Sequence, residues 1–166
     1  YDPYAQNLDE AMQPPSARHI MGTDRHGRDM FSRVLVGGKT SIYSTLALVA
    51  AISVFGTVVG TLCGYYGGRV DSVVMRVSDV CLAFPGLVFA MAVAALLGGG
   101  IGNAVLALAV ISWPKYSRVA RSQTLALKSS SFVHAARLSG SGSTRIILRH
   151  ILPNILGPIL VTAMLD

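Results

Sequence analysis

The sequence predicts an all-α fold, a polytopic membrane helical bundle. Of its 166 residues, 52% are hydrophobic and 13% are charged, about half the charged fraction of an ordinary soluble domain. Residues 40–68 and 80–114 carry no charged side chain, and uncharged runs of that length are typical of membrane spans. The low charge excludes a disordered chain. A disulfide scaffold is excluded because the two cysteines, Cys63 and Cys81, lie in or beside apolar runs.

Residues 1–39 form the first expected unit, an extracytoplasmic segment. Within it, residues 24–35 predict a short amphipathic helix that Gly37 and Gly38 would end. Three pairs of opposite charge are spaced i,i+4 there: Asp24–Arg28, Arg25–Asp29 and Asp29–Arg33. Such a helix can lie in the membrane interface before the first span. A solvated charged helix that merely precedes the span is the open alternative.

Residues 40–166 form the expected transmembrane unit. Its spans are predicted at about 41–66, 78–97 and 103–116, with the glycine cluster Gly98–Gly102 as the turn between the last two. A further span begins at Pro153 and would rise only about 20 Å before Asp166, against about 30 Å of hydrocarbon. We therefore expect a fragment that lacks the first span and the C-terminal spans.

Lysine and arginine set the expected orientation. Residues 115–150 hold seven of them and no acid, whereas residues 1–39 hold five of each sign. The positive-inside rule therefore places the loop 115–150 in the cytoplasm of a multi-pass protein of the cell (inner or plasma) membrane. A nucleic-acid partner would explain the positive charge equally well but not the flanking spans, so none is expected.

The first span carries a regular glycine pattern. Gly56, Gly60, Gly64 and Gly68 recur at every fourth residue and would line one helix face. Such a face lets a second helix approach the backbone closely, in this chain or in another subunit. Chance spacing in a glycine-rich membrane chain is the alternative.

The basic loop predicts a short exposed helix. Residues 115–128 extend the preceding helix, Ser131 is a plausible N-cap, and Gly140 is a typical C-terminal stop. A further helix begins at Gly142–Ser143. Two adjacent alanines, Ala135 and Ala136, offer a surface that another protein can approach. An ordinary solvated loop explains the composition equally well.

Three stretches resemble one family. His134-Ala135-Ala136-x3-Gly140, followed by Leu152-Pro153, resembles the EAA loop of binding-protein-dependent ABC importer permeases. The stretches Gly22-Thr23-Asp24-x2-Gly27-Arg28-Asp29-x2-Ser32-Arg33 and Gly67-Gly68-x2-Asp71-x3-Met75-Arg76-x2-Asp79-x4-Phe84-Pro85 resemble the dipeptide, oligopeptide and nickel branch. The likeness runs from Tyr1 to Asp166 and is greatest to the C-type partner of the permease pair.

The resemblance implies a permease subunit of an ATP-driven importer of short peptides or nickel. Its partners would be a homologous second permease subunit, two cytoplasmic ATP-binding subunits and an extracytoplasmic solute-binding protein. The EAA-like loop would be a coupling helix seated in a groove of the ATPase. The coupling residues would be His134, Ala135, Ala136, Leu138, Ser139 and Gly140. His134 stands where the family has glutamate, so that contact would differ.

No catalytic, cofactor-binding or metal-binding set emerges from the sequence. Gly38-Lys39-Thr40 lacks the earlier glycine and the strand of a phosphate-binding loop. The histidines lack metal-ligand spacing. We therefore expect a transporter without a cofactor rather than an enzyme, with ATP hydrolysed on a partner. A secondary transporter or channel without an ATPase is the alternative; proton coupling would require ionisable groups inside the spans, and residues 41–66 and 80–114 have none.

Overall fold

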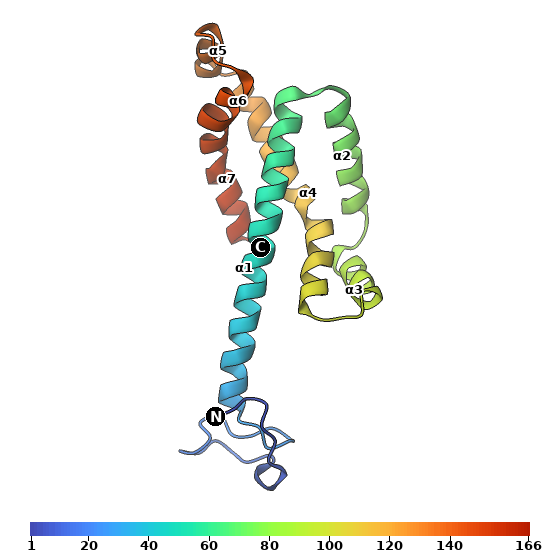
Figure 1. The fold of residues 1–166 in the computed structure, drawn as a ribbon, viewed down its shortest axis with the longest axis vertical. Helices are drawn as coiled ribbons and strands as arrows, with labels where there is room; N and C mark the ends of the chain where they lie inside the picture. Colours follow the sequence, from blue (N-terminus) through green and yellow to red (C-terminus); the bar gives the residue numbers. More distant parts are fainter. The chain divides into compact units, whose positions relative to one another are not determined.

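The computed structural model describes residues 1–166 as helices with no strand, which confirms the all-α prediction. The chain forms two compact units, Tyr1–Leu46 and Ala47–Asp166. Two short elements are a 3-10 turn, Leu8–Glu10, and a π turn, Ile147–Ile151. The helices are α1 (Met30–Tyr66), α2 (Gly68–Ala83), α3 (Gly86–Leu96), α4 (Ile101–Lys128), α5 (Ser131–Leu138), α6 (Ser143–Ile146) and α7 (Leu152–Met164) (Figure 1).

The N-terminal unit folds its first residues as turns, so the helix predicted over residues 24–35 is wrong before Met30. The Asp24 carboxylate accepts the backbone N–H groups of His26 and Arg28 at 2.8 and 3.1 Å. An aspartate that bonds the backbone ahead of it favours a turn over a helix. Gly27 has a φ of 69° and packs directly on the Asn7 carbonyl, where a Cβ would collide. The pair Asp24–Arg28 does form, at 2.8 Å, but within this turn.

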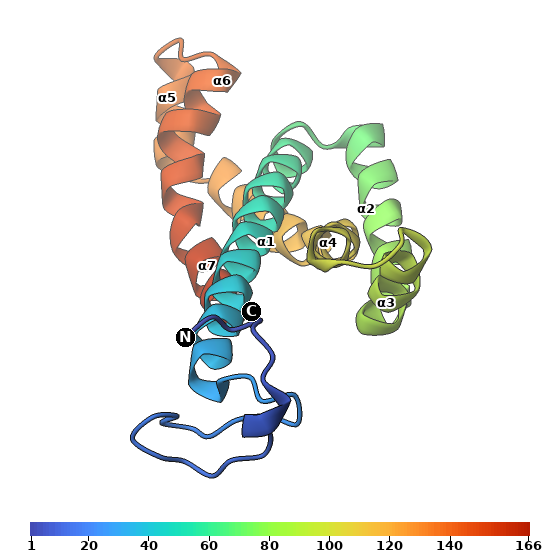
Figure 2. The same ribbon diagram turned by 60° about the horizontal axis from the view of Figure 1, so that its bottom comes forward.

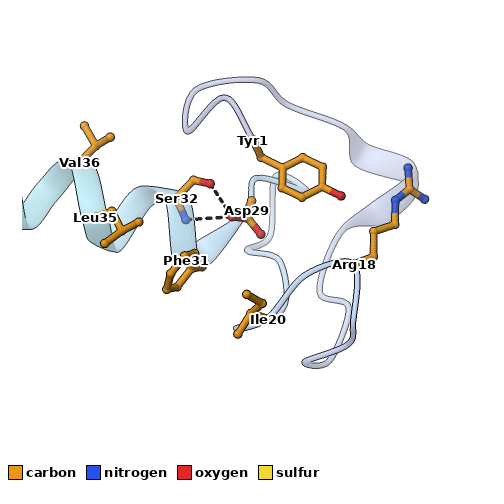
Figure 3. Close-up of a pocket in the computed structure, with 8 residues that line it drawn as sticks. All are labelled: Tyr1, Arg18, Ile20, Asp29, Phe31, Ser32, Leu35 and Val36. Carbon is orange, nitrogen blue, oxygen red and sulfur yellow. Dashed lines mark hydrogen bonds between the residues drawn. The ribbon is translucent and has the colours of Figure 1, made fainter.

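Asp29 caps the start of α1. Its carboxylate accepts the Ser32 backbone N–H at 2.8 Å and the Ser32 hydroxyl at 2.7 Å, as Figure 3 shows. His19, only 3% exposed, contacts the other carboxylate oxygen through Nδ1 at 3.0 Å. The hydrogen bonds from Ser32 and then His19 lower the pKa of Asp29 to about 2. The charged carboxylate therefore ties the turns to the helix.

A cavity of about 450 Å³ lies beside this cap. Tyr1, Ile20 and Phe31 supply apolar wall, and Arg18 is the basic side chain at its rim (Figure 3). Arg18 pairs with Glu10 at 2.8 Å. The cavity thus belongs to the packing of the first turns against the beginning of α1.

Acid should loosen the N-terminal unit through Asp29. Because the folded-state pKa is about 2 and the usual value about 4, the ionised cap stabilises the unit above about pH 4. That contribution falls away as the pH drops through 2. We expect pepsin to cut residues 1–29 of the full-length protein in detergent much faster at pH 2 than at pH 4. The cleavage rate should be normalised to that of an unfolded substrate.

The control for this acid effect is Asp29→Asn. This variant should already be cut quickly at pH 4 and should show a smaller pH dependence. Equal resistance of wild type and variant at pH 4 would contradict the role of the charged cap.

α1 continues well beyond the predicted first span. Its 37 residues correspond to about 55 Å of helix. Gly37 and Gly38 lie inside α1, so they do not end a helix as predicted. Glycine costs about 1 kcal/mol in a helix, and the long apolar run that follows outweighs that cost. The predicted end near Tyr66 agrees with the structure.

The predicted span 78–97 is two helices rather than one. α2 ends at Ala83 and α3 begins at Gly86, with a bend of 89° between them. Pro85 restricts the residue before it to extended backbone, and Phe84 has ψ 144°. The break therefore follows from the Phe84–Pro85 dipeptide.

Two helices are long and apolar enough to cross a membrane, α1 and the continuous helix Ser143–Met164; α2 and α3 would add a third as one bent span. The predicted span 103–116 is the first part of α4, which continues as a helix to Lys128. Gly98, Gly99 and Gly100 all have positive φ and form the turn before α4. The four-span division stays a prediction.

The helix Ser143–Met164 contains the π turn just before α7. Pro153 has no N–H to donate to the carbonyl of Arg149, and its ring crowds that carbonyl. The backbone widens there: the Leu152 N–H donates to the Ile147 carbonyl. The Asn154 side-chain amide donates to the His150 carbonyl at 2.7 Å. The span was predicted to begin at Pro153. In the structure, Pro153 lies just after the point where one continuous helix changes from π to α geometry.

The core of the second unit lies where α1, α4 and α7 meet the loop helices. Its members are Ile52, Tyr65, Tyr116, Ala120, Val133, Ile146, Ile147, Ile151, Ile155 and Ile159. Figures 1 and 2 both show α5 and α6 together at one end of this unit, above α7. The core therefore reaches into the basic loop and holds it.

Candidate functional site

The basic loop folds into α5 and α6, close to the limits expected from the sequence. α5 covers Ser131–Leu138, with Ser130 rather than Ser131 as N-cap. Gly140 follows with φ 79°, the left-handed conformation that ends helices and favours glycine. Gly142 is the N-cap of α6. α4 runs on to Lys128, so the loop proper is residues 129–142.

One face of α5 is anchored to the core. Val133 is fully buried, and Ala136 packs partly buried against the same cluster. These two residues are three positions apart and so share one side of the helix. Ala136 is therefore part of the anchor and is only half available to a partner.

The opposite face of α5 is exposed. His134, Ala135, Ser139 and Gly140 are all exposed, and Leu138 is 90% exposed. Phe132, which the sequence analysis did not select, is 42% exposed beside them. Phe132 and Ala135 lie three residues apart, a spacing that could have identified the phenylalanine from the sequence. We call Phe132, His134, Ala135, Leu138 and Ser139 the outer face of α5.

The glycine row of α1 packs on α4. A Cβ on Gly56 would lie 2.6 Å from the Tyr116 Cβ, and one on Gly64 2.8 Å from the Arg121 carbonyl. A Cβ on Gly60 would collide with the Ser117 carbonyl. Three of the four glycines thus bring the α1 backbone against α4, as close helix packing requires.

Gly68 does not share this contact, contrary to the predicted row of four. α1 ends at Tyr66, and Gly67 and Gly68 both take positive φ, 67° and 71°. No atom lies within 4 Å of the position of a Cβ on Gly68. Its role is conformational, because the chain must turn sharply from α1 into α2.

Ion pairs join α2 to α4. The Asp71 carboxylate accepts two hydrogen bonds from the Arg121 guanidinium, both at 2.6 Å. Asp79 pairs with Arg118, two turns further along α2. Bidentate pairing fixes direction as well as distance, so it aligns α2 along α4. Sequence spacing could not have matched these partners, because they lie 50 and 39 residues apart.

No group of three or more His, Cys, Asp or Glu side chains converges as a metal site would require. His19 is enclosed between Asp29 and Glu10, whose carboxylate oxygen lies 3.7 Å from Nε2. Cys63 and Cys81 are free. The outer face of α5 is the candidate site, because it is an exposed surface of small and apolar side chains on an anchored helix.

Comparison with known proteins gives one family and a consistent set of relatives. Residues 56–166 match the family described as binding-protein-dependent transport system inner membrane component. The probable D,D-dipeptide transport system permease protein of Escherichia coli is 45% identical over the whole chain, which covers 56% of that protein.

Two further relatives have similar coverage. The dipeptide transport system permease protein of Alkalihalophilus pseudofirmus is 40% identical over 98% of the chain and 54% of its own length. The nickel transport system permease protein of Escherichia coli is 37% identical over the whole chain and 60% of its own length. The chain thus spans somewhat more than half the length of these relatives.

The family match covers α4, the loop and α7, and the relatives also align across the N-terminal unit. Apolar helices of spanning length are present in the structure. These findings confirm the resemblance to the dipeptide, oligopeptide and nickel branch and the multi-pass inner-membrane location. The chain belongs to the binding-protein-dependent transport system inner membrane component family, and the relatives it resembles include permease proteins of peptide and nickel transport systems.

Proposed function

We propose that this chain is part of a permease subunit of an ATP-driven importer and forms half of a translocation path for short peptides or nickel. The observation that carries the proposal is the outer face of α5: an exposed apolar surface on a helix that the core holds from behind. Exposed apolar side chains on an anchored helix are typical of protein contact sites. The names of the relatives support the choice of cargo.

The partner on that face would be a cytoplasmic ATP-binding subunit. Arg137 and Arg145 lie on α5 and α6 and no acidic residue occurs between 115 and 150, so the loop favours the cytoplasmic side. The turn from α1 to α2 lies at the same end, since Lys128 donates to the Tyr65 carbonyl there. The turn from α1 to α2 and the basic loop are therefore neighbours.

ATP hydrolysis would take place on the partner, and the loop would transmit the movement. The proposed complex contains a homologous second permease, two ATP-binding subunits and an extracytoplasmic solute-binding protein. Cargo would be moved because nucleotide binding favours one of two permease conformations. His134 stays exposed on the outer face, where a neutral imidazole would offer hydrogen bonds instead of the carboxylate charge of the family.

The test is purification and uptake with the full-length protein. A tag on this subunit should bring down a second permease and ATP-binding subunits from the native membrane. Uptake of a labelled dipeptide or of radioactive nickel should stop when the ATPase subunit is inactivated and should survive a protonophore that leaves ATP intact. Uptake that ends with the protonophore alone, and no ATPase in the purified material, would support the alternative of a secondary transporter.

A further inference from the structure

Tyr65 lies in the last turn of α1, where that helix meets the loop. It is 6% exposed and belongs to the same core cluster as Val133 of α5 and Ile146 of α6. A buried tyrosine brings a hydroxyl that needs a polar partner. Its polar contacts therefore show what this position does besides packing.

Those polar contacts reach two of the segments that frame the loop, the end of α4 and the last turn of α5. Lys128, the last residue of α4, donates to the Tyr65 carbonyl at 2.5 Å, and its ammonium lies 5.6 Å from the ring centroid. Arg137 of α5 donates to the Tyr65 hydroxyl at 3.5 Å. One residue of α1 thus makes polar contacts with the end of α4 and the last turn of α5, and it belongs to the same apolar cluster as Ile146 of α6.

Apart from the Tyr65 hydroxyl, α5 is held to the core by the apolar residues Val133 and Ala136. Short connections flank the helix, residues 129–130 and 139–142, and Val133 is its only fully buried side chain. Apolar contacts are not directional, so Val133 and Ala136 turn one side of α5 toward the core without fixing its exact orientation there. A hydrogen bond to the tyrosine hydroxyl is directional and lies on a different turn of α5 from Val133.

We propose that Tyr65 is a positioning residue that fixes the orientation of α5 on the end of α1, so that movement of the outer face is passed to the spans. This inference rests on the proposed function for its consequence in transport. Its structural part, the ordering of the loop, stands without that function. Tyr65 would not contact the ATPase or the cargo.

The test compares Tyr65→Phe with Tyr66→Phe in the full-length permease, assembled with its partners in lipid. The first change removes only the hydroxyl and keeps the buried ring. The second is a matched control, because Tyr66 is 61% exposed and the hydrogen bond from Arg137 goes to the hydroxyl of Tyr65. Hydrogen exchange of residues 131–143 and the ratio of labelled dipeptide or nickel imported to ATP hydrolysed should be measured on both.

For Tyr65→Phe, amide exchange in residues 131–143 should rise about fivefold, the change expected from the loss of one hydrogen bond. Import per ATP should fall by a similar factor, while the ATPase subunits still co-purify. Tyr66→Phe should match wild type in both measurements.

Two results would overturn the inference. Unchanged exchange in Tyr65→Phe would show that the hydroxyl does not order the loop. Faster exchange with unchanged import per ATP would show that the ordering has no part in coupling. Failure of the proposed function is recognised separately, since no variant would then import either cargo or bring down an ATPase, whereas the exchange result would still be readable.

Discussion

Ala135→Trp should abolish import by the assembled transporter while leaving the permease folded and inserted. Ala135 lies on the outer face of α5, exposed between Phe132 and Leu138. A tryptophan there adds a large side chain to a surface that must fit a groove, and we expect a loss of about a hundredfold in uptake, equivalent to about 3 kcal/mol at a contact hot spot. Uptake of labelled dipeptide and of nickel, and transport-coupled ATPase activity, measure the effect.

The matched control is Ala135→Ser, which keeps the position small and should import normally. Ala136→Trp is a poorer test, because Ala136 packs against the core and a large side chain there would disturb the fold. Normal import by Ala135→Trp, with the variant present in the membrane at wild-type level, would remove the coupling role of α5.

Gly60→Leu should separate α1 from α4 and destabilise the second unit. Even the Cβ of an alanine at this position would collide with the Ser117 carbonyl, which is backbone and cannot swing away. We expect a cost above the 1–3 kcal/mol that is usual for overpacking in a core. Thermal unfolding of the full-length protein in detergent should show a large loss of stability, and the amount of folded protein in the membrane should fall.

Gly38→Leu is the control on the same helix, because a Cβ at that position would meet no atom of another segment within 4 Å. It should unfold at the wild-type temperature or slightly above it, since leucine favours a helix more than glycine does. Equal stability of Gly60→Leu and Gly38→Leu would show that the α1–α4 contact tolerates side chains, contrary to the structure.

Local sequence signals predicted most of the helices correctly. They failed where a side chain forms hydrogen bonds with the backbone. The Gly98–Gly100 turn, the end of α1 at Tyr66 and the limits of α5 follow from glycine, serine and apolar patterns. The helix predicted from Asp24 was wrong because i,i+4 charge spacing also suits a turn capped by an aspartate. Pro85 could have predicted the break between α2 and α3, but the prediction gave more weight to the long uncharged run that contains it.

The family motif identified the candidate site, and the structure shows that the motif residues lie on different sides of α5. The sequence selected His134, Ala135, Ala136, Leu138, Ser139 and Gly140 as one group, and their role in coupling stays a prediction. The structure separates Ala136, which faces the core, from Ala135 and Leu138, which do not. It also adds Phe132 to the outer face and Tyr65 behind α5. Ala135 and Ala136 are adjacent and identical residues of an eight-residue helix, so the sequence alone does not reveal which of the two faces the core.

By itself, the sequence determined that this is a membrane protein of α-helices, where its uncharged runs and glycine turns lie, and which family it resembles. These properties depend on composition and on residues close together in the chain, so they can be read locally. Only the tertiary structure decided that Gly56, Gly60 and Gly64 meet α4, that Asp71 pairs with Arg121, and that Tyr65 reaches the loop. Those contacts join residues about 50 or more positions apart, and they form only where helix packing brings complementary side chains together.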